Sequence, residues 1–383
     1  VSLLADRAGR YFTAVILGVA GLSFLYWAPS DLGKAVNAFT AVLVIACPCA
    51  VALSIPFTMG NVLRILGRNR FYVKNTNVLE AFSAVRAVVF DKTGTITNLS
   101  KNVVQFFGKR LSGADQVALK SLAYQSSHPL SRQIVESMPE VPVETVENFV
   151  EQPGQGISGR VAGSIVRLGS AAFISANQPG QKGVFTEKDG EVCGYFDIKS
   201  RFREGLPEVL SYFNSQNAGA TLLSGDNNRE QDALTAYFKA PGTLFFNQSP
   251  QDKLDFVKKT QQEGRQVLML GDGLNDAGAL RQSDVGIVVA ENTNNFTPAC
   301  DAILHADEFH RLPKFLSLAG WGITTVNRAY LLAACYNVVG LSYAVTGTLS
   351  PVVAAILMPL SSVTIVLFGF GMSHWKAWRL GLL

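Results

Sequence analysis

Three apolar runs in this sequence each lead into acidic residues, and this pattern limits the possible fold more than any other feature. The runs and their acidic residues are 85–90 with Asp91, 221–223 with Asp226, and 267–270 with Asp272 and Asp276. Short runs rich in β-branched and aliphatic residues are typical of buried parallel strands. Open α/β sheets bind ligands at the carboxyl ends of their strands. The sequence therefore predicts a phosphate and Mg²⁺ site at one edge of such a sheet.

The motifs around these acidic residues resemble the catalytic signature of the P-type ATPases, membrane pumps built on a haloacid dehalogenase-like phosphorylation domain. The motifs are DKTGT at 91–95, SGD at 224–226 and GDGLND at 271–276. The resemblance runs nearly from end to end of the chain. It implies an α/β, Rossmann-like phosphorylation domain with an inserted α+β nucleotide-binding domain, flanked by two pairs of transmembrane α-helices.

This resemblance assigns roles to individual residues. Asp91 would be the nucleophile that takes the γ-phosphoryl group of ATP as an aspartyl-phosphate. Asp91, Asp272 and the Thr93 carbonyl would hold Mg²⁺. Thr95, Ser224 and Lys253 would hold phosphoryl oxygens, and Asn275 and Asp276 would order the site. The remaining catalytic candidates are Lys92, Thr93 and Asp226. The chemistry agrees, because a transferring phosphoryl group needs a metal ion and a cation around its oxygens.

One position favours a pump over a phosphatase. Phosphatases of this superfamily usually carry an Asp two residues after the nucleophile, as a general acid and base. Here that position is Thr93. Without a resident base, hydrolysis of the phosphoenzyme should be slow, so the intermediate can drive another process.

The resemblance also predicts where the domains begin and end. They are a helix pair with the metal site at 1–63, a discontinuous phosphorylation domain at 64–99 and 195–325, a nucleotide-binding domain at 100–194, and a second helix pair at 326–383. Within the nucleotide-binding domain, the motifs at 127–130 and 154–159 resemble the family's His-Pro motif and glycine turn. The candidate ATP-binding residues are His128, Pro129, Gly154, Gly156 and Gly159. Three departures from the family pattern, Ala123, Ser170 and Ser200, predict a weaker or different adenine contact.

Four uncharged runs predict membrane spans. They are residues 11–28, 36–59, 329–347 and 352–373, in a chain with 48% hydrophobic residues and a mean hydropathy of +0.21. Runs of this length can cross a bilayer. Basic residues follow the second and the last run, so the positive-inside rule predicts cytoplasmic catalytic domains in an integral, multi-pass membrane protein. The net charge of +4 gives no indication of nucleic acid binding.

The second run contains the sequence Cys47-Pro48-Cys49. Pro48 removes a helical hydrogen bond, and an unwound helix near mid-membrane is tolerated where it lines an ion site. A pair of reduced thiolates at such a break could face one ion. A CPC triplet in this span resembles the heavy-metal-pumping subgroup.

The last two runs favour Cu⁺ as the transported ion. Tyr336-Asn337 and the segment from Met358 to Ser362 resemble the YN and MxxSS signatures of the Cu⁺-transporting branch, and residues 329–373 contain no charged residue. Soft thiolates and thioethers select Cu⁺, whereas Zn²⁺ sites commonly add His or a carboxylate. The candidate ligands are Cys47, Cys49 and Met358, with Tyr336, Asn337 and Ser362 as polar supports.

The expected function is therefore ATP-driven transport of a soft metal cation, with ATP and Mg²⁺ as cofactors. The alternatives are a pump for Zn²⁺ or another heavy metal, and a catalytically incomplete membrane protein that binds copper or nucleotide. Because no TGE-type loop occurs, the resemblance implies the C-terminal portion of a longer pump, without its actuator domain and further helices. The expected partners are the lipid bilayer, copper from a copper chaperone and the remaining part of the pump.

Overall fold

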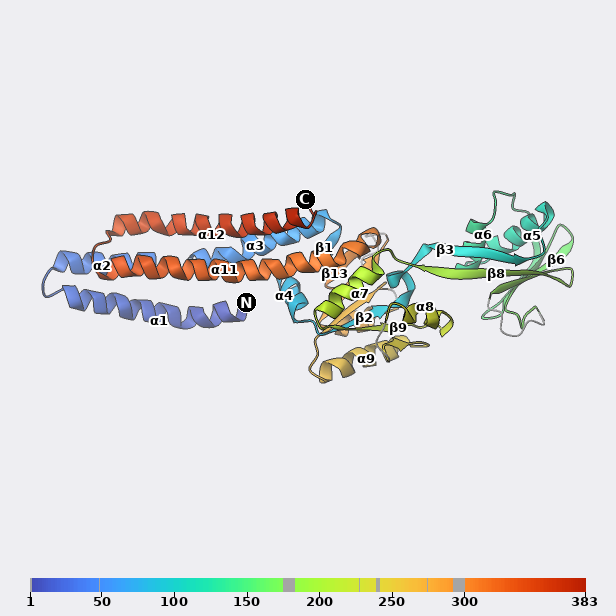
Figure 1. Cartoon of the computed structure of the whole chain (residues 1–383), viewed down its shortest axis with the longest axis horizontal. Coiled ribbons are helices and arrows are strands. Elements are labelled where there is room, and N and C mark those ends of the chain that lie inside the picture. The colour runs from blue at the N-terminus through green and yellow to red at the C-terminus, as the bar shows by residue number, and fades with distance from the viewer. Residues whose placement is uncertain are drawn as a thin grey trace. The chain divides into compact units, whose positions relative to one another are not determined.

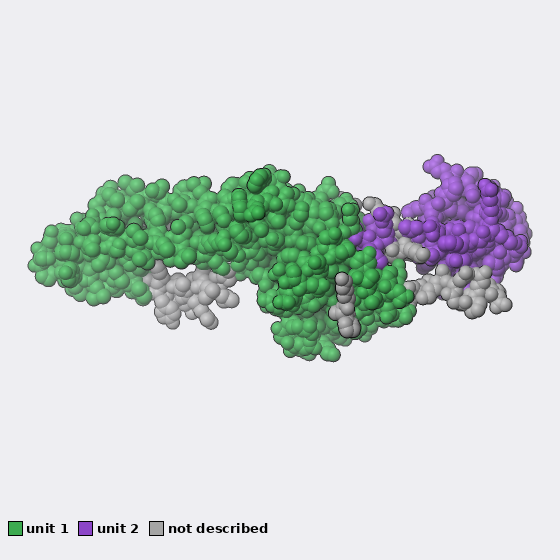
Figure 2. Space-filling view, in the orientation of Figure 1, with its two compact units in different colours: residues 1–95, 204–383 green, residues 96–203 purple. Residues whose placement is uncertain are grey.

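The computed structural model describes residues 2–47, 49–174, 183–226, 228–238, 242–273, 275–291 and 300–383. Within these ranges, the side chains of residues 2–12, 49–51, 99–102, 129, 199–200 and 229 are not described. The chain forms two compact units, residues 1–95 with 204–383 and residues 96–203 (Figure 2).

The first unit contains a sheet whose strands run in the order β1-β13-β12-β11-β2-β9-β10. The strands are β1 (Phe71–Val73), β2 (Ala87–Asp91), β9 (Gly219–Leu223), β10 (Leu244–Phe245), β11 (Val267–Gly271), β12 (Val285–Ala290) and β13 (Ala302–His305). The antiparallel pairing of β1 with β13 is at one edge, and the other described pairs are parallel. This sheet confirms the predicted Rossmann-like class.

The three predicted acidic strand ends meet in the middle of this sheet. β2 is paired with β9 on one side and with β11 on the other. Every residue of β2 and β11 is buried, which explains why their sequences read as continuous apolar runs rather than as alternating ones. The chain places β9 and β10 on one side of β2 before it returns to β11 on the other side. This reversal creates the crevice where doubly wound sheets bind ligands.

Helices surround this sheet. They are α4 (Thr76–Ala84), α7 (Leu206–Ser215), α8 (Gln231–Thr235), α9 (Pro250–Gln262) and α10 (Ala277–Gln282). The start of α9 is set by a capping box, in which Ser249 Oγ accepts from the Asp252 amide at 3.2 Å and the Asp252 carboxylate accepts from the Ser249 amide at 2.8 Å. The cap fixes Lys253 in the first turn of α9, next to the sheet.

The second unit is a six-stranded antiparallel sheet in the order β3-β8-β7-β6-β5-β4. Its strands are β3 (Thr97–Gly108), β4 (Val146–Gln152), β5 (Gly156–Val161), β6 (Ser164–Gly169), β7 (Val184–Lys188) and β8 (Glu191–Phe202). Two helices, α5 (Gly113–Tyr124) and α6 (Pro129–Ser137), contribute Leu122 and Ile134 to a separate core. The chain enters and leaves the unit through paired strand ends, since Thr97 lies opposite Phe202.

The apolar runs form long helices of the first unit (Figure 1). They are α1 (Ser2–Trp27), α2 (Leu32–Ile45), α3 (Cys49–Arg68), α11 (Leu312–Val345) and α12 (Pro351–Arg379). α3, α11 and α12 pack against one another along their lengths. In the described part of the chain, α12 alone is long and apolar enough to cross a membrane by the test of length and composition, and Thr13–Trp27 and Leu32–Ile45 are shorter apolar helices.

This result differs from the prediction of four spans, and the second predicted span shows one reason. The run 36–59 is divided between α2, which ends at Ile45, and α3, which begins at Cys49. Each part of the run is therefore shorter than the roughly 20 residues that a continuous membrane helix needs.

Candidate active site and metal-binding segment

A buried lysine joins two carboxylates at the carboxyl end of β2. Lys253 Nζ lies 2.5 Å from Asp91 Oδ1 and 2.7 Å from Asp276 Oδ1. The exposed fractions are 4% for Asp91, 5% for Lys253 and 1% for Asp276. The three residues come from the end of β2, the first turn of α9 and the start of α10, and only the folded sheet brings them together.

The arrangement changes the proton affinity of each group. Burial raises the pKa of Asp91 to about 7, and the Asp276 carboxylate adds to the rise, whereas Lys253 opposes it. Burial also raises the pKa of Asp276, again against the effect of Lys253. Burial by itself would lower the pKa of Lys253, but the two carboxylates more than offset it, so this pKa is raised. The lysine therefore stays charged beside the predicted nucleophile.

A second lysine, Lys92, is held by two carboxylates as well. Lys92 Nζ lies 2.6 Å from Asp226 Oδ2 and 2.9 Å from Glu230 Oε2. Thr93 Oγ1 donates to Asp226 Oδ2 at 3.2 Å. The loop after β9 is thus tied to the loop after β2. The sequence analysis did not single out Glu230, and no local motif marks it, since its partner Lys92 lies 138 positions away.

The loop from Lys92 to Ile96 turns sharply at Gly94, whose φ of +72° favours glycine. Thr95, which follows Gly94, and Ser224, which follows β9, are both fully buried. Ser224 Oγ accepts from the Asp226 amide at 3.1 Å, which shapes the loop after β9. Asn275 is exposed at the same sheet edge, and Leu274 before it lies outside the described residues.

The side chains at this edge could supply only some of the ligands that Mg²⁺ needs. This is expected for an ion that also takes ligands from the phosphate groups of a substrate. Among the described residues, no group of three or more His, Cys, Asp or Glu side chains could hold a metal ion. Asp272 is half-buried and acts electrostatically on Asp91 and Asp276, and Asp276 Oδ2 is buried without a hydrogen-bond partner in the described structure. Mg²⁺ usually takes one or two carboxylates, with phosphate and water oxygens as the remaining ligands.

The predicted ATP-binding residues lie in the second unit. His128 is the N-cap of α6, where its Nδ1 accepts from the Leu130 amide at 3.2 Å, and Pro129 is the first helical residue. The side chain of Pro129 lies outside the description. The His128 amide donates to Ser126 Oγ at 3.1 Å, and Ser126 donates to Glu151 at 2.9 Å. Local hydrogen bonds therefore fix the position of the His128 ring.

The predicted glycine turn is mostly a strand. Gly154 lies in the turn with a φ of +74° and open space around it, whereas Gly156 and Gly159 belong to β5. A Cβ at Gly156 would lie 2.4 Å from the Leu168 carbonyl oxygen, and one at Gly159 would lie 2.5 Å from Val146 Cγ1. Close packing thus accounts for both strand glycines, and their contact with nucleotide stays a prediction.

The CPC segment coincides with the break between α2 and α3. Cys47 follows the end of α2, Pro48 is outside the described residues, and Cys49 begins α3 with its side chain undescribed. Ile45 packs in one cluster with Leu357, and a Cβ at Gly340 would lie 2.6 Å from Ile45 Cγ1. The break therefore lies at the level of Gly340 on α11 and Leu357 on α12.

The other candidate metal-site residues lie at the same level. The Tyr336 hydroxyl donates to the Leu357 carbonyl at 3.2 Å, which links α11 to α12 beside Met358. The Met358 carbonyl accepts from Ser361 Oγ at 2.7 Å and from Ser362 Oγ at 3.3 Å. Met358, Tyr336 and Asn337 are half-buried. The MxxSS spacing therefore has a local structural role next to the helix-interior Pro359.

The oxidation state of Cys47 in the structure differs from the predicted one. Cys47 is disulfide-bonded, whereas the sequence predicts a reduced thiolate. A disulfide sulfur has no negative charge, so this form of Cys47 cannot be the predicted soft anionic ligand. Among the remaining described cysteines, Cys193 and Cys335 are free.

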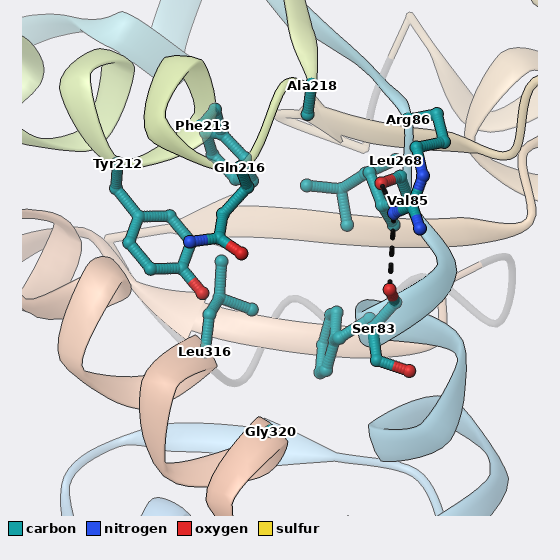
Figure 3. Close-up of a pocket in the computed structure, with 11 residues that line it drawn as sticks. Ser83, Val85, Arg86, Tyr212, Phe213, Gln216, Ala218, Leu268, Leu316 and Gly320 are labelled. Carbon is teal, nitrogen blue, oxygen red and sulfur yellow. Dashed lines mark hydrogen bonds between the residues drawn. The ribbon is translucent and has the colours of Figure 1, made fainter.

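A separate cavity of about 150 Å³ lies at the opposite, amino-terminal edge of the sheet (Figure 3). It is lined by Arg86 near the start of β2, Tyr212 and Gln216 near the end of α7, and Leu316 on α11. Arg86 donates to the Ser83 carbonyl at 3.3 Å on one side of this cavity. The cavity is not the candidate site, because the acidic strand ends are at the other edge.

Comparisons with known proteins place the chain in a family. The family model for haloacid dehalogenase-like hydrolases matches residues 85–284, just over half of the chain. A copper-transporting ATPase of Helicobacter felis is 30% identical over 96% of this chain and 52% of the relative. A copper-exporting P-type ATPase of Mycobacterium tuberculosis is 31% identical over 95% of this chain and 50% of the relative. The chain thus spans about half the length of these curated relatives.

A solved zinc-transporting PIB-type ATPase has the same fold, with a TM-score of 0.80, 24% sequence identity, and coverage of 96% of this chain and 63% of the other. Together, the family match and the three acidic strand ends show that the chain belongs to the haloacid dehalogenase-like hydrolases, and over nearly its whole length it is similar to copper-transporting and copper-exporting ATPases.

Proposed function

We propose that this chain forms an aspartyl-phosphate from ATP and couples it to the movement of Cu⁺ across a membrane. The observation that carries the proposal is the ion pair of buried Lys253 with Asp91 and Asp276 at the carboxyl end of β2. The copper-transporting and copper-exporting relatives support the choice of ion.

The chemistry is a direct phosphoryl transfer. An Asp91 carboxylate oxygen attacks the γ-phosphorus of ATP, the bond from that phosphorus to the bridging oxygen breaks, and ADP leaves with the electron pair. Lys253 supplies a fixed positive charge for the phosphoryl oxygens, and its bonds to Asp91 and Asp276 hold it in place. Thr93 cannot act as a general base, so the acyl phosphate should persist.

Asp91, Asp272 and the Thr93 carbonyl would hold Mg²⁺. When bound, the ion neutralises charge on the phosphoryl oxygens. Asn275 would order the same edge of the site. In the second unit, His128 and the turn at Gly154 would contact ATP.

Reduced Cys47, Cys49 and Met358 would bind Cu⁺ at the break between α2 and α3, with Tyr336, Asn337 and Ser362 in support. Broken helices of this kind form ion sites only where they line a cavity within the bilayer. The proposal therefore places α1, α2, α3, α11 and α12 in a membrane, with the sheet on the cytoplasmic side. Delivery of Cu⁺ by a copper chaperone and cooperation with the segments present only in the longer relatives belong to the same proposal.

The test is phosphoenzyme formation by the purified, reconstituted chain from ATP labelled at the γ-phosphoryl group. We expect acid-stable label that requires Mg²⁺ and rises with Cu⁺ under reducing conditions. A rise with Zn²⁺ instead would keep the phosphorylation chemistry and change the ion. Label that ignores both metals would indicate a phosphorylated protein without transport coupling.

The metal-binding segment has its own test. Changing Cys47→Ser together with Cys49→Ser should leave ATP binding unchanged and remove the Cu⁺ response. Cys193→Ser is the matched control, because this free cysteine lies in the second unit. The Cu⁺ response should also disappear without reductant, since the disulfide form of Cys47 is not a ligand. A Cu⁺ response that survives in the double variant would contradict the assigned site.

A further inference from the structure

A group of aromatic and cationic side chains lies at the adjoining ends of α11 and α12. We call it the tryptophan–cation cluster, and it consists of Trp321, Arg328, Trp375, Lys376 and Arg379. The two indole rings are 5.8 Å apart between centroids. Arg328 Cζ and Lys376 Nζ lie 4.9 and 5.1 Å from the centroid of the Trp321 ring, and Arg379 Cζ lies 5.1 Å from that of Trp375.

The cluster is held in a fixed arrangement. Trp321 Nε1 donates to the Met372 carbonyl at 3.1 Å, which joins α11 to α12 and orients the indole ring that the two cations contact. Trp375 is 41% exposed and Trp378, one turn further, is 69% exposed. The Trp321 ring is therefore anchored, and the neighbouring Trp375 and Trp378 rings are accessible, as interfacial tryptophans are.

The charges of the cluster are not neutralised within the described structure. Arg328, Lys376 and Arg379 have no described carboxylate within ion-pair distance. By contrast, Arg311 near the same helix ends pairs with Glu308 at 2.9 Å. Three cations held against two adjacent rings repel one another, so an anion with several oxygens would lower their energy.

The position of the cluster indicates which anion this is. Arg328 immediately precedes the apolar run 329–347 of α11, and Lys376 and Arg379 are in the last turn of α12. Exposed apolar side chains, Leu367 and Phe370, lie on α12 before the cluster. An apolar helix surface followed by cationic and aromatic side chains is complementary to a phospholipid. The acyl chains would lie along the helix, and the phosphate would lie at the cations.

We propose that the tryptophan–cation cluster binds the headgroup of an anionic phospholipid, with Arg328 and Lys376 beside the Trp321 ring supplying positive charge for its phosphate. The proposal rests on the proposed membrane position of α11 and α12, and it adds a specific lipid partner. Each cation near a membrane surface contributes about a fivefold preference for anionic lipid. The pair should therefore give a preference of about 25-fold for phosphatidylglycerol over phosphatidylcholine.

The test is quenching of tryptophan fluorescence by brominated lipids in vesicles that contain the whole chain. Brominated phosphatidylglycerol or brominated phosphatidylcholine is diluted into plain phosphatidylcholine. We expect brominated phosphatidylglycerol to quench at a much lower mole fraction. In the double variant R328Q/K376Q the two lipids should quench equally. The matched control is Lys34→Gln, which removes the cation that lies 3.5 Å from the Trp27 ring on another helix, and it should keep the preference.

Equal quenching by both lipids in the unaltered chain would overturn the lipid site, and so would an unchanged preference in R328Q/K376Q. Loss of the preference on addition of inorganic phosphate would also overturn it, because the cluster would then bind the free anion. Absence of quenching by either lipid would show that the helices are outside the bilayer, which would instead contradict the membrane part of the proposed function. Circular dichroism of the double variant checks that it is folded.

Discussion

At the scale of single residues, the candidate site is defined by two lysines that each contact two carboxylates. Lys253 joins Asp91 to Asp276, and Lys92 joins Asp226 to Glu230. Removing one partner of a buried ion pair leaves the other charge without compensation. Substituting either partner should therefore have a measurable effect.

Asp91→Asn should abolish acid-stable phosphoenzyme and leave the fold intact. The substitution should also change how stability depends on pH. Because the pKa of Asp91 is about 7 in the folded chain and 3.8 for an exposed carboxyl, the folded state binds more protons between these values. The stability contributed by this group is therefore largest below pH 3.8 and is lost as the pH rises through about 7.

Without Mg²⁺, the melting temperature of the unaltered chain minus that of D91N should thus fall from about pH 5 to about pH 8. Thermal unfolding at several pH values measures this difference. Asp255→Asn, at an exposed position of α9, is the control and should show no such trend. A melting-temperature difference that rises with pH would mean that Lys253 lowers the pKa of Asp91 by more than burial raises it.

Glu230→Gln tests the residue that sequence reasoning missed. The change removes one charged hydrogen bond to Lys92, which is worth about 1.5–3 kcal/mol, and leaves Asp226 in place. We expect phosphoenzyme formation to slow by about tenfold, with the fold retained. Rapid-quench kinetics with labelled ATP measures the rate. Glu208→Gln, on the exposed side of α7, is the control, and an unchanged rate in E230Q would make Glu230 a structural residue only.

At the scale of elements, the long helices depend on close contacts between small residues. Gly369 on α12 lies directly against Thr58 on α3, since a Cβ at Gly369 would be 2.1 Å from Thr58 Oγ1. A turn further along, Asn61 donates to Ser373 at 2.8 Å. Small and polar side chains of this kind are what allow membrane helices to approach closely.

Gly369→Val should therefore separate α3 from α12. Overpacking of this type costs about 1–3 kcal/mol, so the melting temperature in detergent should fall by several degrees. Gly371→Val is the matched control on the same helix, because a Cβ there meets nothing within 4 Å. Equal effects of the two substitutions would show that helix propensity, rather than the contact with Thr58, determines the result.

At the scale of the whole molecule, the chain has two units, each with its own core. The second unit begins and ends at neighbouring points, since the Arg203 amide donates to the Ile96 carbonyl at 2.8 Å. Units whose ends are adjacent and whose core is separate can fold on their own.

Residues 96–203 should accordingly form a folded domain when expressed alone, with a cooperative thermal transition followed by circular dichroism. Within this fragment, Leu122→Ala should lower the free energy of unfolding by about 2–5 kcal/mol, because Leu122 is fully buried in the core. Tyr124→Ala is the control on the same helix, where the side chain is 63% exposed. A fragment without a cooperative transition would show that this unit needs the first one to fold.

The sequence by itself determined the class of fold and the strand ends at which the candidate site lies. β-Branched runs that end in Asp91, Asp226 and Asp272 indicate buried parallel strands through local patterning alone, and the sheet and the family match confirm this class. The break between α2 and α3 coincides with the CPC segment that the sequence singled out, although Pro56 and Pro359 are accommodated inside continuous helices.

Tertiary structure alone decided which side chains meet. Lys253 reaches Asp91 across 162 positions of the chain and Glu230 reaches Lys92 across 138, and no local pattern specifies such pairs. The glycines at 156 and 159 read as a ligand loop in sequence but are strand residues packed against backbone and core. The tryptophan–cation cluster likewise needs two helices in contact. These features depend on how distant elements pack, because burial and close approach are properties of the assembled fold.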